Sequence, residues 1–264
     1  MKIYVSVDME GIAGILLPEQ LKKGESFYEE ARRLLTAEVN TVVEGLLEAG
    51  AKDIYVKDAH GTGYNFITSE LHPRARYCMG ATTLRQRFPG LDSSFDGAML
   101  IGYHAKGGTE HAIRDHTMSS AGWQSLLLNG KPIGEIGLDG LLFGLHEVPI
   151  LLVTGDKKTC SEAHEEIPNV CTYETKEAFG RHAGLIKPPK LVYEELRKCI
   201  GLSIENRNKV LPCHINGPYE LLVHFLSTDQ ADARYFDGVR SKRIDGLTAA
   251  YYGADIIGVL SLAM

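Results

Sequence analysis

The sequence lacks the features of membrane proteins and of nucleic-acid-binding proteins. No apolar run approaches the roughly 20 residues that a membrane helix needs, and no cluster of Lys and Arg is interleaved with aromatic residues. The formal net charge of −6 disfavours binding to phosphates. Met1 leads directly into a strand-like segment instead of a basic region followed by an apolar stretch. We therefore expect a cytoplasmic protein with neither a membrane nor a nucleic acid as its partner.

Cysteine is scarce, and its spacing indicates no site. The five cysteines form an odd set without a C-x-x-C pair. Neither a disulfide framework nor a structural zinc site built of thiolates is expected, and the cysteines fit reduced thiols in a reducing compartment. The apolar fraction of 44% and the charged fraction of 23% are ordinary for a globular protein with a sizeable core.

Strands and helices alternate along the first part of the chain. Residues 2–7 alternate apolar and polar side chains, and the segments 53–58 and 97–103 predict two further strands. Apolar residues recur at helical spacing over 26–49, and Gly50 marks the end of that helix. Strand, helix and strand in this order imply parallel pairing. We predict an α/β fold of three layers, αβα, with a mainly parallel central sheet.

A β-hairpin is predicted near the candidate site. Asn129-Gly130 is a strong turn signal between the strand-like segments 123–128 and 131–136, which places Glu135 on the return strand. The α/β pattern then continues with a helix over 137–145, a strand over 148–154, helices over 157–167 and from Pro188-Pro189 to about 208, a strand over 219–225 and a terminal helix from about Gly246. We expect a single α/β domain over 1–264, in which residues from about 186 to 264 either form a smaller C-terminal lobe or complete the sheet.

Acidic and imidazole side chains follow the ends of three predicted strands. Asp8 and Glu10 come directly after the first strand, His60 follows the second, and His104 follows the third. The carboxyl ends of parallel strands meet at one sheet edge, where α/β proteins bind ligands. With Glu135, the set holds three carboxylates and two imidazoles, which suit zinc, manganese or iron. Two ions that share a bridging carboxylate would use all five ligands.

Each of these residues also has an ordinary structural interpretation. An acid after a strand often caps a helix or forms a turn, and a single His there is more often structural than a ligand. The metal site depends on the coincidence of several such residues at one predicted edge, so the residues alone leave both interpretations open. Asp139, shortly after Glu135, is a further acid that would suit the role of holding a metal-bound imidazole.

Four ordered motifs resemble those of the D-aminopeptidase family of binuclear zinc peptidases. They are Ser6-Val7-Asp8-Met9-Glu10-Gly11, Asp58-Ala59-His60, Gly102-Tyr103-His104-Ala105 and Pro132-Ile133-Gly134-Glu135-Ile136-Gly137-Leu138. The spacing between the first three is similar to the family pattern. The resemblance runs from Met1 past Gly155-Asp156.

The resemblance implies a site, a reaction and an assembly. Two zinc ions per chain would be held by Asp8, which would bridge them, and by Glu10, His60, His104 and Glu135. The family removes an N-terminal D-residue from short peptides or amides, which implies hydrolysis by a hydroxide that bridges the metals. Its members form homo-oligomers, which implies a decameric ring that hides the sites in a channel.

The family also places a catalytic His after the third strand. Asp115-His116-Thr117-Met118 corresponds to that stretch, so the resemblance implies that His116 passes a proton to the leaving amine. The segment 105–122 departs from the family pattern in length, however, and His111 is therefore a competing candidate.

Two other functions stay open. The same ligands would serve a different metal-dependent amidohydrolase, because the ligands determine hydrolysis whereas the pocket determines the substrate. A non-catalytic metal-binding or peptide-binding protein in transport or sensing would also retain them. The residue pattern alone sets neither the preference for D-residues nor the oligomeric state.

Overall fold

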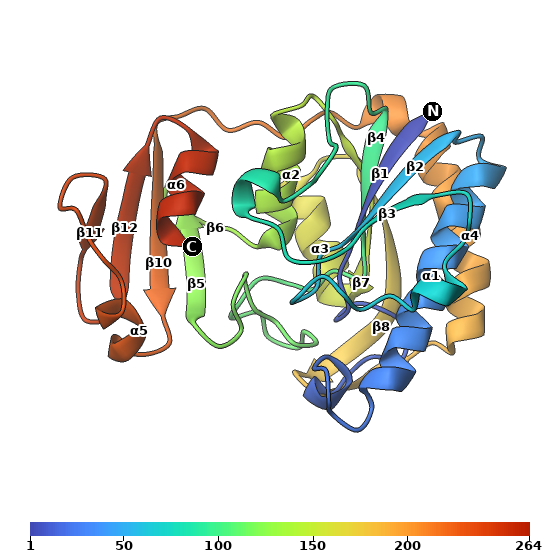
Figure 1. The fold of residues 1–264 in the computed structure, drawn as a ribbon, viewed down its shortest axis with the longest axis horizontal. Coiled ribbons are helices and arrows are strands. Elements are labelled where there is room, and N and C mark those ends of the chain that lie inside the picture. The colour runs from blue at the N-terminus through green and yellow to red at the C-terminus, as the bar shows by residue number, and fades with distance from the viewer.

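The chain forms two β-sheets. A computed structural model describes all of residues 1–264. The first sheet is parallel except for β9, which pairs antiparallel with β8. Its seven strands are, in sheet order, β3 (Arg76–Cys78), β2 (Asp53–Asp58), β1 (Lys2–Val7), β4 (Gly97–Ile101), β7 (Ile150–Asp156), β8 (Cys171–Gly180) and β9 (Ala183–Ile186). The first strand of the chain therefore lies inside the sheet, between β2 and β4 (Figure 1).

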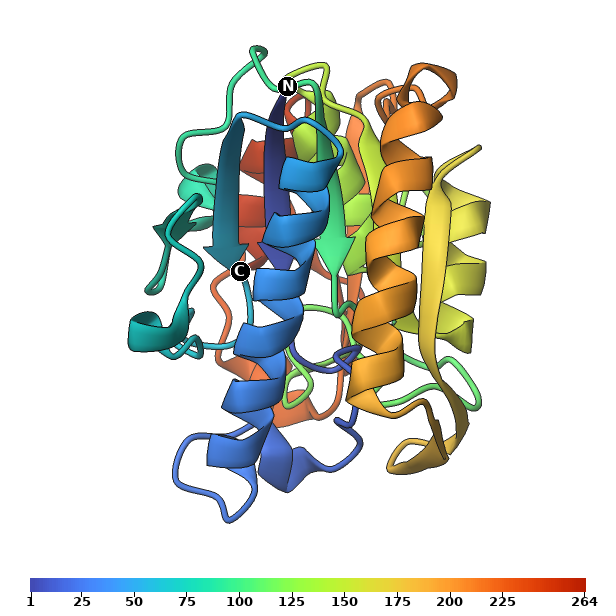
Figure 2. The same cartoon turned by 90° about the vertical axis from the view of Figure 1, so that its right-hand side faces the viewer.

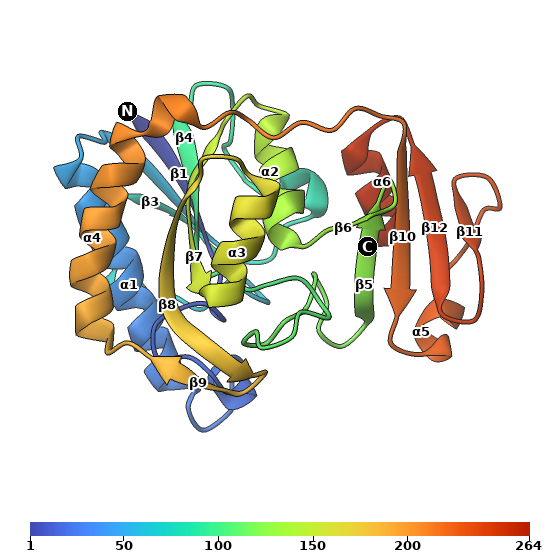
Figure 3. The same cartoon turned by 180° about the vertical axis from the view of Figure 1, so that it is seen from behind.

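Helices cover both faces of this sheet. All residues of β4 and β7 are buried, and β1 is buried from Ile3 onward, as expected for strands enclosed on both faces. Helices α1 (Tyr28–Glu48) and α4 (Pro189–Glu205) lie side by side on one face (Figure 2). Helices α2 (Glu135–Gly144) and α3 (Lys157–Glu166) lie on the other (Figure 3). The predicted three-layer αβα architecture is confirmed.

The second sheet is antiparallel and combines two distant parts of the sequence. It lies beside the α2 and α3 layer, at the left of Figure 1. Its five strands are, in sheet order, β11 (Ser241–Arg243), β12 (Thr248–Gly253), β10 (Tyr219–Phe225), β5 (Trp123–Leu128) and β6 (Lys131–Pro132). One continuous set of buried apolar side chains includes residues of both sheets.

Short helices complete the chain. They are the 3-10 helices η1 (Pro18–Gln20), η2 (Thr68–Glu70), η3 (Leu84–Gln86) and η4 (Arg207–Lys209) and the α-helices α5 (Thr228–Asp232) and α6 (Ile256–Ala263). None of the helices combines the length and the apolar character that crossing a membrane requires.

The predicted hairpin is present, but its return strand is shorter than expected. Asn129 and Gly130 have φ values of 50° and 78°, as a two-residue hairpin turn requires. The strand predicted over 131–136 ends at Pro132, and after one more hydrogen bond, from the N–H of Ile133 to the Leu126 carbonyl oxygen at 3.1 Å, the chain leaves β5. Gly134 then caps α2, so the prediction that Glu135 lies on a strand is wrong, and Glu135 is the first residue of a helix.

The terminal helix predicted from about Gly246 is wrong in its first half. Residues 248–253 form β12, which pairs with β10 on one side and with β11 on the other. Only Ile256–Ala263 is helical, and the Asp255 side chain caps it by accepting from the N–H groups of Ile257 and Gly258. The apolar pattern of a short segment does not distinguish a buried strand from a buried helix. Here pairing with β10 and β11 makes the segment a strand.

A buried lysine fixes the loop that follows β1. Lys176 on β8 is 2% exposed. Its Nζ donates to the main-chain oxygens of Glu10, Ile12 and Ile15 at 2.6, 2.7 and 2.5 Å. Burial lowers the pKa of Lys176 to about 8, so the ammonium group keeps its three protons at neutral pH, one for each carbonyl. Glu38 on α1 accepts a further N–H from the same loop, at 2.9 Å.

Replacing Lys176 tests how much its three hydrogen bonds to the loop after β1 stabilise the fold. The change Lys176→Met leaves three buried carbonyls without a donor, and we expect the free energy of unfolding to fall by about 3 kcal/mol or more. Urea denaturation measures it. Lys158→Met is the matched control, because Lys158 is exposed on α3, and a change within about 0.5 kcal/mol is expected there. Equal losses in the two variants would contradict a specific role for Lys176.

Candidate active site

The carboxyl edge of the first sheet brings the predicted ligand residues together. Asp8 and Glu10 follow β1, and His60 and His104 follow the strands on either side of it. Glu135 reaches the same place from the first turn of α2. The residues Asp8, Glu10 and Glu135 are 6%, 3% and 8% exposed, so the cluster is largely shielded from solvent.

Asp8 lies at the centre of the cluster. Its Oδ1 is 3.0 Å from Nδ1 of His60, and its Oδ2 is 3.3 Å from Nε2 of His104. Glu10 Oε2 lies 3.1 Å from the same nitrogen of His60, and Glu135 Oε1 lies 3.2 Å from the same nitrogen of His104. The five side chains thus form two sets of three ligand atoms, one around each imidazole, which share the Asp8 carboxylate.

Hydrogen bonds define which imidazole nitrogens carry protons. His104 Nδ1 lies 3.0 Å from the Ala105 carbonyl oxygen, and His60 Nε2 lies 3.0 Å from that of Leu21. A carbonyl only accepts, so these nitrogens donate, and in each neutral ring the nitrogen that faces the carboxylates has a lone pair. Nε2 of His104 is buried and has no hydrogen-bond partner.

This arrangement fits divalent metal ions. Converging lone pairs of carboxylates and imidazoles repel one another unless a cation or protons lie between them. Ligand atoms of Asp8, Glu10 and His104 lie within 4.8 Å of one another, as do those of His104, His116 and Glu135. Three carboxylates and two or three imidazoles are the donor set of catalytic zinc, manganese or iron sites.

Electrostatics at the cluster favours positive charge. Burial by itself lowers the pKa of His60 and of His104, but the neighbouring carboxylates outweigh it and raise both pKa values well above the usual range. Burial raises the pKa of Asp8, but the two imidazoles that face its oxygens lower this pKa well below the usual range. Burial also raises the pKa of Glu135, but the neighbouring His104 and His116 outweigh this effect and lower the pKa to about 2.

Contacts with Met118, in the loop before β5, and with Arg87, just after η3, hold Glu135 in place. Its Oε1 accepts from the N–H of Met118 at 2.7 Å, and its Oε2 lies 3.5 Å from Nη2 of Arg87. A Cβ atom on Gly134 would meet the Glu162 carboxylate and would lie 2.8 Å from Cβ of Lys106, so a side chain here would force these neighbours to shift. A helix N-terminus also favours a carboxylate at this position.

Asp139 does not have the role considered for it. It holds no imidazole and instead pairs with Arg87, whose Nη2 donates to its Oδ2 at 2.9 Å. Tyr103 Oη donates to the same oxygen at 2.6 Å. Asp139 is fully buried, so this pair keeps the Arg87 guanidinium beside Glu135. No periodicity or motif pointed to Arg87, because it lies in an irregular stretch just after η3.

His116 lies at the cluster, whereas His111 does not. The His116 ring stacks on that of His104, with centroids 3.8 Å apart and planes 14° apart. Its Nδ1 donates to the Arg114 carbonyl oxygen at 2.8 Å, which leaves Nε2 with a lone pair 3.8 Å from Oε1 of Glu135. His111 is exposed, and its ring contacts the Phe179 carbonyl oxygen outside the cavity that contains the cluster.

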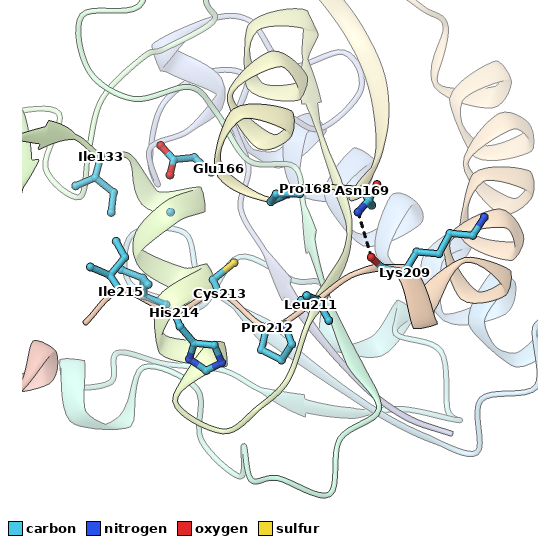
Figure 4. Close-up of a pocket in the computed structure, with 12 residues that line it drawn as sticks. Ile133, Glu166, Pro168, Asn169, Lys209, Leu211, Pro212, Cys213, His214 and Ile215 are labelled. Atoms are coloured by element: carbon cyan, nitrogen blue, oxygen red, sulfur yellow. Dashed lines mark hydrogen bonds between the residues drawn. The ribbon is translucent and has the colours of Figure 1, made fainter. Parts of the chain in front are cut away.

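A cavity of about 520 Å³ opens onto the cluster, a size suited to small ligands. Besides the predicted residues, its walls include the cations Lys22, Arg87 and Arg114 and the segment 118–121. A second cavity, of about 280 Å³, lies on the far side of α2 between Glu166, Lys209 and Cys213 (Figure 4). It contains none of the cluster residues.

The fold and the site define an α/β enzyme of the hydrolase class, and comparisons with known proteins specify it. The sequence profile of the D-aminopeptidase peptidases matches residues 1–264. The curated D-aminopeptidase of Bacillus subtilis (strain 168) is 33% identical over 232 residues, which are 88% of this chain and 84% of the relative. The chain therefore belongs to the D-aminopeptidase family.

A solved structure agrees with this assignment. It is described as "Zn-dependent D-aminopeptidase DppA from Bacillus subtilis, a self-compartmentalizing protease". The two chains are 30% identical and superpose with a TM-score of 0.94, over 100% of this chain and 95% of the other. The match covers both sheets, so the second sheet is common to the two proteins.

The charges of the cluster predict opposite responses to pH with and without metal. Without metal, the raised pKa values of His60 and His104 stabilise the fold fully below the ordinary value of 6.5, and this contribution is lost as the pH rises through the folded values. The lowered pKa values of Asp8 and Glu135 change the free energy of unfolding only at acidic pH, where these carboxylates become protonated. We expect the chelator-treated protein to lose free energy of unfolding as the pH rises above about 6.5.

With zinc added, the trend should reverse. Protons compete with metal for the imidazoles, so a higher pH strengthens binding and stabilises the folded chain. Urea denaturation with chelator and with zinc, at matched ionic strength, measures both slopes. The control is His60→Asn, in which the alkaline loss of the chelator-treated protein should shrink. The same slope with and without zinc would contradict a metal-binding cluster.

Proposed function

We propose that this protein is a zinc-dependent aminopeptidase that removes an N-terminal D-residue from short peptides or amides. In this proposal two zinc ions per chain are held by Asp8, Glu10, His60, His104 and Glu135. The supporting observation is the geometry of Asp8, whose two oxygens face two different imidazoles. The relatives' names support zinc and D-residues as the metal and the substrate.

The residues of the cavity have distinct roles in this reaction. Zinc at this position, when bound, supplies a water of lowered pKa and polarises the scissile carbonyl. His116, with Nε2 free and its ring held against His104, is placed to carry a proton to the leaving amine. Arg87 lies 3.5 Å from Glu135 and offsets the negative charge of that carboxylate while keeping it in position.

We further propose a homo-oligomeric, decameric ring in the cytoplasm. The similar structure is described as self-compartmentalizing, which supports assembly. Large apolar side chains are exposed on this chain, among them Phe179, Leu185, Leu211, Tyr235 and Val239, and burial between subunits would remove them from water. All five cysteines are free thiols, which supports a reducing compartment.

Metal content and stereochemical preference test this function together. We expect about two zinc ions per chain, a solution mass several times the 29.0 kDa of one chain, and cleavage of D-Ala-D-Ala at least about tenfold faster than L-Ala-L-Ala. Dialysis against a strong chelator should abolish cleavage, and zinc should restore it. Glu10→Gln should lose turnover with little change in folding.

Several results would contradict the proposal. Cleavage that survives complete metal removal would exclude metal-dependent hydrolysis, and a strong preference for L-residues would point to a different amidohydrolase. Tight peptide binding by the metal-loaded protein without release of amine would indicate a binding protein.

Replacing His116 separates a proton carrier from a metal ligand. If His116 transfers protons, His116→Ala should lower kcat by about 10²- to 10⁴-fold while bound zinc per chain stays unchanged. Elemental analysis beside steady-state kinetics measures both. His111→Ala is the matched control and should keep its activity, because His111 lies outside the cavity. Loss of zinc from His116→Ala would make His116 a ligand instead.

A further inference from the structure

Arg114 is the one arginine of the active-site cavity that has no partner. Its guanidinium makes no hydrogen bond and no ion pair, and its Nε is buried without a partner. The other arginine in the wall, Arg87, is bound to Asp139 and lies beside Glu135. Lys22 also lines the cavity without a partner, but it is exposed, so water solvates its charge.

The backbone of Arg114 is held firmly although its side chain is not. Its φ of 53° is in the left-handed region, which a long side chain rarely adopts. Its N–H donates to the Arg181 carbonyl oxygen at 3.1 Å, and its own carbonyl oxygen accepts from Nδ1 of His116 at 2.8 Å. Strained backbone of this kind persists where the surroundings enforce it, and such positions are common at active sites.

An unpaired guanidinium in this position is costly. Burial and the nearby Arg181 both disfavour its charged form and lower the pKa of Arg114. Leaving the buried Nε of a charged group without an acceptor destabilises the folded protein. A ligand that supplies acceptors to the guanidinium would remove this cost, so the cavity is complementary to an anion at Arg114.

We propose that Arg114 binds the C-terminal carboxylate of the substrate. This inference rests on the proposed peptidase function and identifies the residue that would distinguish a peptide with a free carboxylate from its amide. The planar guanidinium matches a carboxylate through two parallel hydrogen bonds. Each residue spans at most about 3.6 Å, so only a short peptide places its carboxylate on the cavity wall while its first peptide bond lies at the cluster.

Kinetics on a pair of substrates tests this assignment. The pair is D-Ala-D-Ala and its C-terminal amide, which differ in the charge of the terminal group. We expect the wild-type protein to have a kcat/KM about 10- to 100-fold higher for the free peptide, as a charged hydrogen-bonded pair implies. Arg114→Gln should remove most of this preference, mainly through KM, and Arg114→Lys should restore part of it.

Lys22→Gln is the matched control, because it removes one positive charge from the same cavity. The preference for the free peptide should persist in that variant. The zinc content of Arg114→Gln should equal that of the wild type and its unfolding midpoint should be at least as high, which would show that the cluster and the fold are intact.

The possible failures are distinguishable. A wild-type protein that cleaves neither substrate overturns the proposed peptidase function and this inference with it. A wild-type protein that cleaves both equally well overturns carboxylate recognition alone, whether or not any variant folds. Equal losses on both substrates in Arg114→Gln, or loss of the preference in Lys22→Gln instead, would also exclude the role of Arg114.

Discussion

The site depends on one constraint, which is that a single carboxylate faces two imidazoles on neighbouring strands. Asp8 can do this because β1 lies between β2 and β4, so the residues after those strands, His60 and His104, flank it at 3.0 and 3.3 Å. Parallel pairing brings all three strand ends to the same edge. The remaining parts of the site secure this arrangement, because Lys176 clamps the loop after β1 and Arg87 holds Glu135.

Much of the fold and the core of the site followed from local sequence signals. Apolar patterns located β1, β2, β4, β7, β10 and the four helices α1, α2, α3 and α4, since these elements bury one or both faces. Strand-end position then selected Asp8, Glu10, His60 and His104, which the structure brings together. The motif resemblance added Glu135 and His116, which no strand-end argument reached.

The features that sequence did not reveal depend on distant partners. Strand β8 was not anticipated, because its mixed sequence becomes a strand only beside β7 and β9, and β12 was mistaken for a helix for a similar reason. Glu135 was placed on a strand although Pro132 and Gly134 end the pairing and start α2. Arg87 and Arg114 lie on irregular segments, where no period or motif marks a side chain that reaches the cavity.

The second sheet has a consequence for when the site can form during synthesis. His116 precedes β5 and Glu135 follows β6, so both residues belong to a segment whose middle is anchored in that sheet. The partner of β5 is β10, which the ribosome produces roughly ninety residues later, together with β12. Pairing over such a sequence distance is slow to form. A nascent chain that has folded its first sheet can therefore already hold His116 through the contacts of Arg114 and Asp115 with Arg181, whereas β5, which lies between His116 and Glu135, has no β10 to pair with until the end of translation.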